Sequence, residues 1–235
     1  DLPIQREKYT DYPVCQASGI KGVVREWFWE KYGGKDEKIK YTFGPDFSRG
    51  ESDAHAGAAT FTDGRILLFP VRSLNGVFAY TTSVFVLSRL KRDLEMVADM
   101  EVDWRIPQNS DKALGAAESK VKTADNKVVL EEYTFDFEAN ESVREIAEWI
   151  AENAIPQGKE YEFWREKVKT DLLILPENAF RDFVKLSTEV QARIRINNVT
   201  KTVDKGALFY EEALPCDSLL YSIVLAHDPA CNGAN

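Results

Sequence analysis

The sequence predicts an α+β fold of ferredoxin-like type, in which an antiparallel sheet carries helices and insertions. Helix-like and strand-like segments alternate irregularly, without a strict βαβ repeat, and residues 187–215 have the pattern of a long β-hairpin. The 235 residues, 44% of them hydrophobic and 29% charged, are enough to bury a core. We expect a single domain over residues 1–235 with insertions at roughly 34–57 and 100–170.

The hairpin is the clearest element. Its first strand alternates apolar and polar side chains, which predicts one buried face: Val190, Ala192, Ile194 and Ile196 alternate with Gln191, Arg193, Arg195 and Asn197. A polar turn follows, and Ala207–Leu214 forms a second strand with Glu211 and Glu212. Arginines on an open face suit a phosphate backbone, because the guanidinium is always charged and presents a rigid fork of donors. The alternative is a solvent-exposed strand face on which the arginines pair with the glutamates of the other strand. On the evidence of this hairpin alone we favour that alternative.

Residues 1–13 have no periodicity and contain two prolines, so we expect a loop. Ser18 is predicted to cap a helix that ends at Gly33-Gly34. Gly19, Lys21 and Gly22 then lie in the first turn, where free N–H groups favour an anion and where lysine is unusual. The alternative is that Lys21 merely points into water.

Strands at 58–62 and 65–71 are predicted to form a hairpin around Asp63-Gly64. The next segment, Arg72–Val77, is predicted to lead into a helix ending near Met96. It repeats the small-polar, apolar, Gly, Val order of residues 18–23, which suggests a second helix N-terminus facing an anion. A shared tight turn is the simpler explanation.

The remaining elements follow from local patterns. Residues 101–115 are polar and aperiodic, which predicts a long loop. Strands are predicted at 120–123, 127–137, 172–175 and 219–226, and helices at 141–153, 160–169 and 179–186.

Composition excludes several classes. A net charge of −9 argues against a freely diffusing nucleic-acid binder, although basic residues gather locally at Lys21 with Arg25 and at Arg193 with Arg195. Three widely spaced cysteines indicate neither a zinc motif nor a disulfide framework and fit a reducing cytoplasm. No apolar run is long enough to span a membrane, so no membrane partner is expected. With two histidines, any catalysis must use carboxylates, lysine, tyrosine or a metal.

Several segments share their order and spacing with one family. They are DLPIQRE, the Ser-Gly-Ile-Lys-Gly turn, LLFPVRSLNGVFAYTT, RLKRDLE, DNKVVLEEYTF and STEVQARIRIN…ALFYEEALP. From Asp1 to about Ala226 the chain resembles the backbone RAMP subunit of type III-B CRISPR effector complexes, the fourth of the Cmr subunits.

The resemblance implies a modified RNA-recognition-type ferredoxin palm with inserted helical elements and a protruding thumb. It also implies partners: guide CRISPR RNA, single-stranded target RNA, copies of the chain in a helical filament, and other subunits of the effector complex. Each copy is expected to cleave target RNA at regular intervals.

The resemblance also implies site residues. Asp1 corresponds to the catalytic aspartate, as a base or as a ligand of Mg²⁺ or another divalent cation, and Glu211 or its neighbour Glu212 to an acidic residue near the site. Lys21 corresponds to a guide-contacting lysine. With the helix starts and the hairpin, the predicted RNA-binding set is Ser18, Gly19, Lys21, Gly22, Arg25, Arg72, Ser73, Asn75, Arg193 and Arg195.

The sequence departs from the family in three places. The opening strand with a Thr-His-Pro-Gly region and the C-terminal Gly-rich loop are expected to be absent, and Ala213 stands where relatives often carry an aromatic residue. Two other functions therefore stay open. One is a non-catalytic backbone subunit that binds guide RNA, and the other is a stand-alone guide-processing nuclease, which would need a histidine or tyrosine base.

Overall fold

The computed structural model describes residues 2–33, 37–46, 55–96, 100, 102–108, 110–196, 199–203 and 208–228. Of the residues singled out above, Asp1, Gly34, Asn197 and Ala207 lie outside this set. The chain divides into two compact units. The first comprises residues 1–13 and 66–219, and the second comprises residues 14–65 and 220–235. The insertions expected from the sequence stay a prediction.

The first unit is built on a mixed sheet with the strand order β3-β4-β8-β5-β7-β6. Its strands are β3 (Gly64–Arg72), β4 (Phe78–Ser83), β8 (Leu172–Leu175), β5 (Ala113–Gly115), β7 (Tyr133–Ala139) and β6 (Lys127–Leu130). β4 runs parallel to β8 and β5 parallel to β7, while the other neighbours are antiparallel. This sheet and its helices confirm the α+β class.

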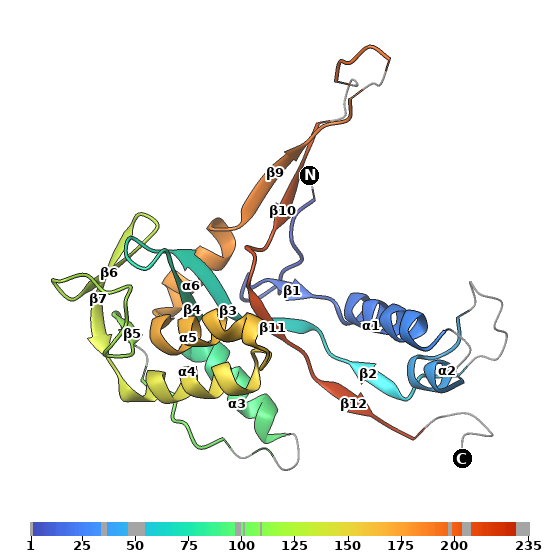
Figure 1. The fold of residues 1–235 in the computed structure, drawn as a ribbon, viewed down its shortest axis with the longest axis horizontal. Helices are drawn as coiled ribbons and strands as arrows, with labels where there is room; N and C mark the ends of the chain where they lie inside the picture. The colour runs from blue at the N-terminus through green and yellow to red at the C-terminus, as the bar shows by residue number, and fades with distance from the viewer. Residues whose placement is uncertain are drawn as a thin grey trace. The chain divides into compact units, whose positions relative to one another are not determined.

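Four α-helices pack with this sheet (Figure 1). They are α3 (Val84–Glu95), α4 (Glu141–Asn153), α5 (Glu162–Asp171), which follows a 3-10 turn at Lys159–Tyr161, and α6 (Glu177–Leu186). α4 begins where predicted because the Asn140 side chain accepts a hydrogen bond from the Ser142 N–H at 3.0 Å. Val143, Ile146 and Ile150 are fully buried, as their spacing on one helix face requires.

The predicted long hairpin is confirmed. β9 (Glu189–Arg193) pairs with β10 (Phe209–Ala213) in an antiparallel register that sets Arg193 opposite Phe209 and Glu189 opposite Ala213. The pair extends from the first unit as an arm, and the N-terminal segment runs beside β10 (Figure 1).

The second unit contains β1 (Val14–Cys15), α1 (Ala17–Tyr32), α2 (Glu37–Phe43), β2 (Ala59–Phe61) and β12 (Val224–Ala226). Strand β11 (Leu219–Tyr221) crosses the boundary between the units, since the second unit resumes at Leu220. β2 pairs with β12, and β1 pairs with Gly64 and Arg65 at the start of β3. The rings of Phe28, Phe43 and Phe61 form a continuous apolar contact.

Three sequence predictions of local pairing are wrong. Segments 58–62 and 65–71 are strands but not a hairpin, because β2 pairs with β12 instead of β3. Segment 127–137 is two strands, since Glu131 adopts a positive φ of 49° and turns the chain between β6 and β7. Segment 219–226 is likewise divided into β11 and β12. Pairing with distant strands decided the first and third cases, since β12 pairs with β2 and β11 with β3, whereas the turn at Glu131 decided the second.

Three predictions of element type are also wrong. Residues 78–83 form strand β4 instead of the start of a helix, and their Phe, Tyr and Thr side chains suit a strand covered on both faces. Residues 113–115 form β5 in the middle of a sheet, inside the predicted loop. Within 120–123 only a bridge between Lys122 and Val128 forms.

No helix among the described residues combines the length and the apolar character needed to cross a bilayer.

Candidate functional site

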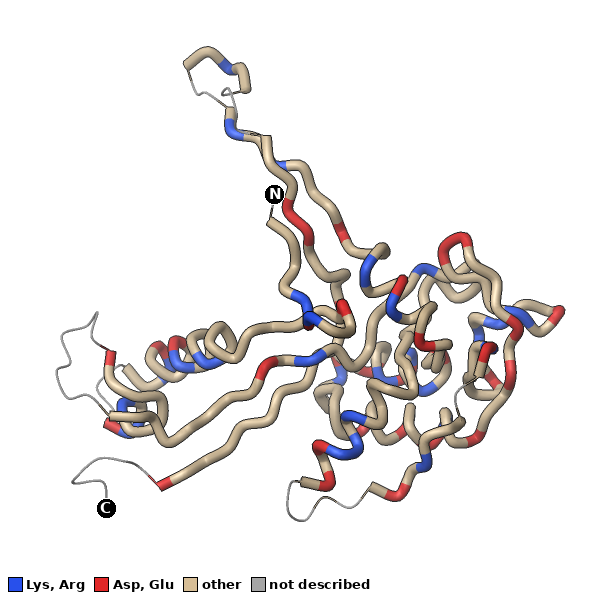
Figure 2. The backbone as a smooth tube through the Cα atoms, turned by 180° about the vertical axis from the view of Figure 1, so that it is seen from behind, with Lys and Arg blue, Asp and Glu red and all other residues tan. Residues whose placement is uncertain are grey.

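The two faces of the hairpin differ in chemistry. Because side chains alternate, Gln191 and Arg193 share one face with Phe209 and Glu211, whereas Val190 and Ala192 share the other with Tyr210 and Glu212. All of β9 is exposed, so the predicted buried face is wrong: the apolar residues of β9 are not covered by this chain. Figure 2 shows acidic positions midway along the arm and basic positions nearer its tip.

Glu211 forms a cross-strand ion pair with Arg193, with 2.9 Å between Oε2 and Nε. This is the Arg/Glu pair favoured from the hairpin sequence, and both side chains are exposed. Arg195 is also exposed. The hairpin therefore carries an acidic and two basic predicted site residues, two of which already neutralise each other.

Glu212 has different surroundings, although it is the next residue. Its Oε1 accepts hydrogen bonds from Arg6 Nη2 at 2.7 Å and from Thr188 Oγ1 at 2.8 Å, and its Oε2 accepts one from the Ile4 N–H at 3.0 Å. Burial tends to raise the pKa of this carboxyl group, but the bonds from Ile4, Thr188 and Arg6 outweigh it and hold the pKa below its ordinary value. Glu212 is thus an ionised anchor.

The N-terminal segment pairs with β10. The Leu2 N–H donates to the Tyr210 carbonyl at 2.7 Å, and the Glu212 N–H donates to the Leu2 carbonyl at 3.0 Å, so that Leu2 bridges Glu211 in parallel. Leu2 is the residue after Asp1 in the chain, while Asp1 itself is outside the described residues. The pairing brings the segment that follows the predicted catalytic aspartate to the acidic pair of the hairpin.

The start of α1 differs from its prediction. Gln16 is the N-cap residue, and Ser18 lies inside the first turn. The Ala17 N–H donates to Asp63 Oδ1 at 2.8 Å, and the Gly19 N–H donates to the Gln16 carbonyl at 3.0 Å. A carboxylate of the chain therefore occupies the helix N-terminus, where an anion is favoured.

The basic side chains of α1 have partners within the second unit. Lys21 Nζ donates to the Ala59 carbonyl at 3.0 Å, and Arg25 Nη2 lies 3.7 Å from Asp46 Oδ2. Gly19 and Gly22 are exposed, with nothing near the positions a Cβ would take. Both basic and acidic positions lie along the helix (Figure 2). RNA binding by Ser18, Gly19, Lys21, Gly22 and Arg25 stays a prediction.

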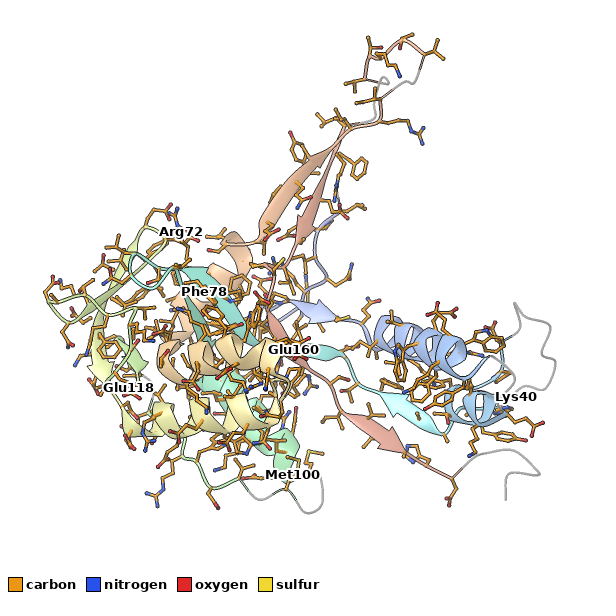
Figure 3. All side chains as sticks on the ribbon, viewed as in Figure 1. Lys40, Arg72, Phe78, Met100, Glu118 and Glu160 are labelled. Carbon is orange, nitrogen blue, oxygen red and sulfur yellow. The ribbon has the colours of Figure 1, made fainter. Side chains whose placement is uncertain are left out.

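The loop at Arg72–Val77 leads into β4, so the prediction of a second helix N-terminus is wrong. Arg72 and Phe78 bound this loop in Figure 3. Arg72 is exposed, with its Nε 3.3 Å from Glu131 Oε2. Asn75 Nδ2 donates to the Lys122 carbonyl at 3.1 Å. Ser73 is only 6% exposed. Asn75 and Ser73 thus shape the loop, and Arg72 presents a charge on it.

A buried ion pair supports the same loop. Lys167 Nζ donates to the Gly76 carbonyl at 2.7 Å and to Asp171 Oδ2 at 2.8 Å, and it lies 4.7 Å from the centroid of the Phe78 ring. Asp171 Oδ1 in turn accepts a hydrogen bond from the Lys120 N–H at 2.8 Å. The ammonium group of Lys167 therefore stabilises the loop that carries three predicted RNA-binding residues, through its hydrogen bond to the Gly76 carbonyl.

Metal ligation finds no support in the described residues. No group of three His, Cys, Asp or Glu side chains in that part of the chain is placed to hold an ion. Glu211 and Glu212 are each engaged by an arginine. The described donor set does not fit a divalent cation on its own.

Comparison with known proteins identifies the family. The model of the RAMP superfamily matches residues 1–226. This chain belongs to the RAMP superfamily. The match runs from the N-terminal segment through the hairpin to β12, so both units are part of the RAMP sequence.

This RAMP chain is similar in sequence to two CRISPR proteins. It is 43% identical over 225 residues to the "CRISPR system Cmr endoribonuclease Cmr4" of Pyrococcus furiosus, covering 96% of this chain and 73% of the relative. It is 23% identical over 240 residues to the "CRISPR system CMR subunit Cmr4" of Saccharolobus solfataricus, covering 96% and 76%.

Solved structures share the RAMP fold seen here. The crystal structure of oligomeric Cmr4 from Pyrococcus furiosus matches with a TM-score of 0.73 and 36% identity, covering 98% of this chain and 76% of that one. A type III-B Cmr-beta complex bound to cognate target RNA contains a chain with a TM-score of 0.72 and 21% identity, covering 97% and 76%, which is a likeness of fold.

Three residues of this RAMP chain that support the site were not predicted from the sequence: Arg6, Lys167 and Asp171. Lys167 and Asp171 are spaced i, i+4 on one helix, which predicts an ion pair, but nothing local predicts its burial. Arg6 lies in a segment without periodicity, and its partner is 206 residues away. Only the fold brings such residues together.

Proposed function

We propose that this chain is an endoribonuclease subunit of a type III-B CRISPR effector complex, which binds guide CRISPR RNA and cleaves complementary target RNA at regular intervals. The observation that carries this proposal is the 43% identity, over 96% of the chain, to a relative named as a Cmr endoribonuclease. The oligomeric structure of that relative supports self-association of this chain in a filament. The other effector subunits are further partners, and we propose a cytoplasmic location.

The chemistry fits the residues available. RNA carries its own nucleophile, because the 2′-hydroxyl can attack the adjacent phosphorus once it loses its proton. The bond from phosphorus to the 5′-oxygen then breaks, the 5′-oxygen takes a proton from water, and the products are a 2′,3′-cyclic phosphate and a 5′-hydroxyl end. We propose Asp1 as the base that takes the first proton, and Glu211 as a second acidic group at the site. The protein needs to align the backbone and stabilise charge on the phosphate.

The pairing of Leu2 with Glu211 supports this assignment, since it draws the segment after Asp1 to the hairpin. Arg193, 2.9 Å from Glu211, is a cation near the same place, and Arg195 is the next basic residue toward the tip. Guanidinium groups can neutralise phosphate oxygens of the bound RNA.

Dependence on Mg²⁺ or another divalent cation is part of the proposal. When bound, such an ion would stabilise charge on the phosphate, with Asp1 as a candidate ligand. Removing divalent ions with EDTA and restoring Mg²⁺ tests this dependence: cleavage that stops and then returns supports it, and cleavage that continues in EDTA contradicts it.

A non-catalytic backbone subunit is the second candidate. The ion pairs of Glu211 and Glu212 favour it, because both carboxylates are engaged by arginines. The test is cleavage of labelled, guide-complementary RNA by the reconstituted complex containing wild-type, Asp1→Ala or Asp182→Ala protein. Asp182 is an exposed carboxylate on α6 and serves as the matched control. Spaced products lost only with Asp1→Ala support the nuclease. Target binding without cleavage by the wild type supports the scaffold.

A further inference from the structure

Arg6 and Glu212 join three parts of the first unit. Arg6 Nη2 donates to Glu212 on the hairpin, while its Nη1 donates to the Val184 carbonyl on α6 at 2.9 Å and to the Asp11 carbonyl at 3.0 Å. The two side chains are 17% and 18% exposed, so water screens the pair only partly. One guanidinium thus links the hairpin, a helix end and the N-terminal segment.

Glu212 fixes the same segment through its backbone. One carboxylate oxygen holds Arg6, and the other accepts the N–H of Ile4. Two residues earlier, Leu2 exchanges two backbone hydrogen bonds with β10. Residues 2–6 therefore lie along the edge of β10 that β9 does not use, attached at Leu2, Ile4 and Arg6.

Apolar burial contributes little to this attachment. Leu2 is 56% exposed, Pro3 and Gln5 are exposed as well, and Ile4 is half-buried. Farther along, Glu7 pairs with the buried Arg89 at 2.9 Å and Asp11 pairs with Lys185 at 2.9 Å, which ties residues 7–11 to α3 and α6. Residues 2–6 are therefore attached mainly by polar contacts to β10, and a shift of the hairpin would move these residues with it.

We infer that Glu212 and Arg6 are positioning residues for RNA cleavage, which fix the segment beginning at Leu2 to β10 beside Glu211. The inference rests on the proposed nuclease function. Glu212 acts through this segment and does not touch the reacting atoms. The two adjacent glutamates therefore have different roles. Glu211 is exposed and pairs with Arg193, whereas Glu212 binds the N-terminal segment through Ile4 and Arg6. A displacement of about 1 Å can cost on the order of 100-fold in rate, so the pair affects cleavage more than RNA binding.

The test uses the reconstituted effector complex with full-length variants. Glu212→Gln keeps the size and shape of the side chain, but its single carbonyl oxygen can replace only one of the two carboxylate oxygens, and the charge that holds Arg6 is removed. Arg6→Gln combined with Glu212→Gln removes both charges and completes a double-mutant cycle for the pair. Glu189→Gln is the control, because Glu189 is an exposed carboxylate of the same hairpin, opposite Ala213.

Three quantities are measured at a temperature where every variant is folded: the single-turnover cleavage rate, the target Kd, and hydrogen exchange of the peptide that contains Leu2 and Ile4. For Glu212→Gln we expect a rate about 10- to 100-fold lower, a Kd within about twofold, and faster exchange in that peptide. Because the two residues act on the segment as one unit, the double variant should lose little more cleavage rate than Glu212→Gln alone. Glu189→Gln should behave as wild type.

Three results overturn the inference. A wild-type cleavage rate for Glu212→Gln, with Asp1→Ala inactive, would leave the nuclease proposal standing and remove the positioning role. Equal losses in rate and target affinity would indicate a general structural role instead. If Asp1→Ala cleaves normally, the assignment of Asp1 fails first, and the positioning inference fails with it.

Discussion

Lys167 Nζ lies 2.8 Å from Asp171 Oδ2, and the two side chains are only 7% and 1% exposed. The pair sits on α5 beneath the loop between β3 and β4, where Lys167 also donates to the Gly76 carbonyl. A buried ion pair is strongly destabilising to break, because the remaining charge has no partner.

Removing one partner of this pair tests its contribution. Lys167→Met should lower the free energy of unfolding by about 3–5 kcal/mol, since Asp171 would stay buried without its cation. Denaturant unfolding monitored by fluorescence measures this change. Lys169→Met is the matched control on the same helix. Its partner Glu166 is exposed and 3.7 Å away, so we expect a loss below about 1 kcal/mol. Equal losses in the two variants would contradict the account.

Val77 tests the strain in the same loop. It has a φ of 73°, which is costly for a β-branched residue, and its side chain is 78% exposed. Val77→Gly should therefore stabilise the fold by about 0.5–1 kcal/mol, after the larger unfolded-state entropy of glycine is subtracted. Leu74→Gly is the control: Leu74 is also exposed but is not at a positive φ, so glycine should destabilise there. Thermal unfolding of both variants gives the comparison, and a loss of stability in Val77→Gly would refute the strain.

Glu212 should give the fold a dependence on acid pH. Its folded-state pKa is lowered because the bonds from Ile4, Thr188 and Arg6 outweigh the effect of burial. A lowered pKa stabilises the fold above the ordinary glutamate value of about 4.3. This stabilisation is lost as the pH falls through the folded-state pKa. Unfolding measured between pH 3 and 6 should show a steeper acid loss in the wild type than in Glu212→Gln. Identical profiles would exclude the effect.

Arg195 offers the simplest test of RNA binding by the hairpin. Arg195→Ala should weaken binding of guide RNA and lower the salt dependence of log K by about one counterion, if the guanidinium neutralises one phosphate. Lys112→Ala removes an exposed cation that pairs with Glu138, and it should change neither quantity. Equal effects of the two variants would mean that overall charge matters, and no effect of Arg195→Ala would exclude the contact.

Arg193→Ala differs from Arg195→Ala because it also releases Glu211. Binding should weaken in a similar way, but an unpaired Glu211 adds repulsion toward phosphate. We therefore expect the loss of RNA affinity in Arg193→Ala to be partly reversed by Glu211→Gln in a double-mutant cycle. Additive effects would show that the ion pair does not modulate RNA binding.

Much of the local structure could be predicted because it depends on neighbours in the sequence. α4 begins and ends at the predicted residues because the Asn140 cap and the apolar spacing lie within one helix. The pairing of β9 with β10 was predicted from the alternating pattern of the first strand and the polar turn that follows it. In contrast, the pairing of β2 with β12 joins residues more than 160 positions apart, and no local pattern contains it.

The candidate site shows the same division. The resemblance points to Asp1, Lys21 and Glu211, and the alternation of the hairpin strand points to Arg193. Glu211 and Arg193 prove to be neighbours across the hairpin. The prediction of a second helix N-terminus at Ser73 and Asn75 is wrong, because the following Phe78–Ser83 matches helical spacing but forms a buried strand. RNA binding by Lys21 stays a prediction, and no local pattern shows its carbonyl partner Ala59, which is 38 residues away.

By itself, the sequence determined the family, the α+β class, most helices and the exposed Arg/Glu face of the hairpin, because motif order, capping and periodicity are local properties. Only the tertiary structure decided which glutamate anchors the N-terminal segment, which cations already have partners, and where the strands pair. These depend on contacts between residues far apart in the chain, and the energies of such contacts come from burial and geometry that exist only once the chain has folded.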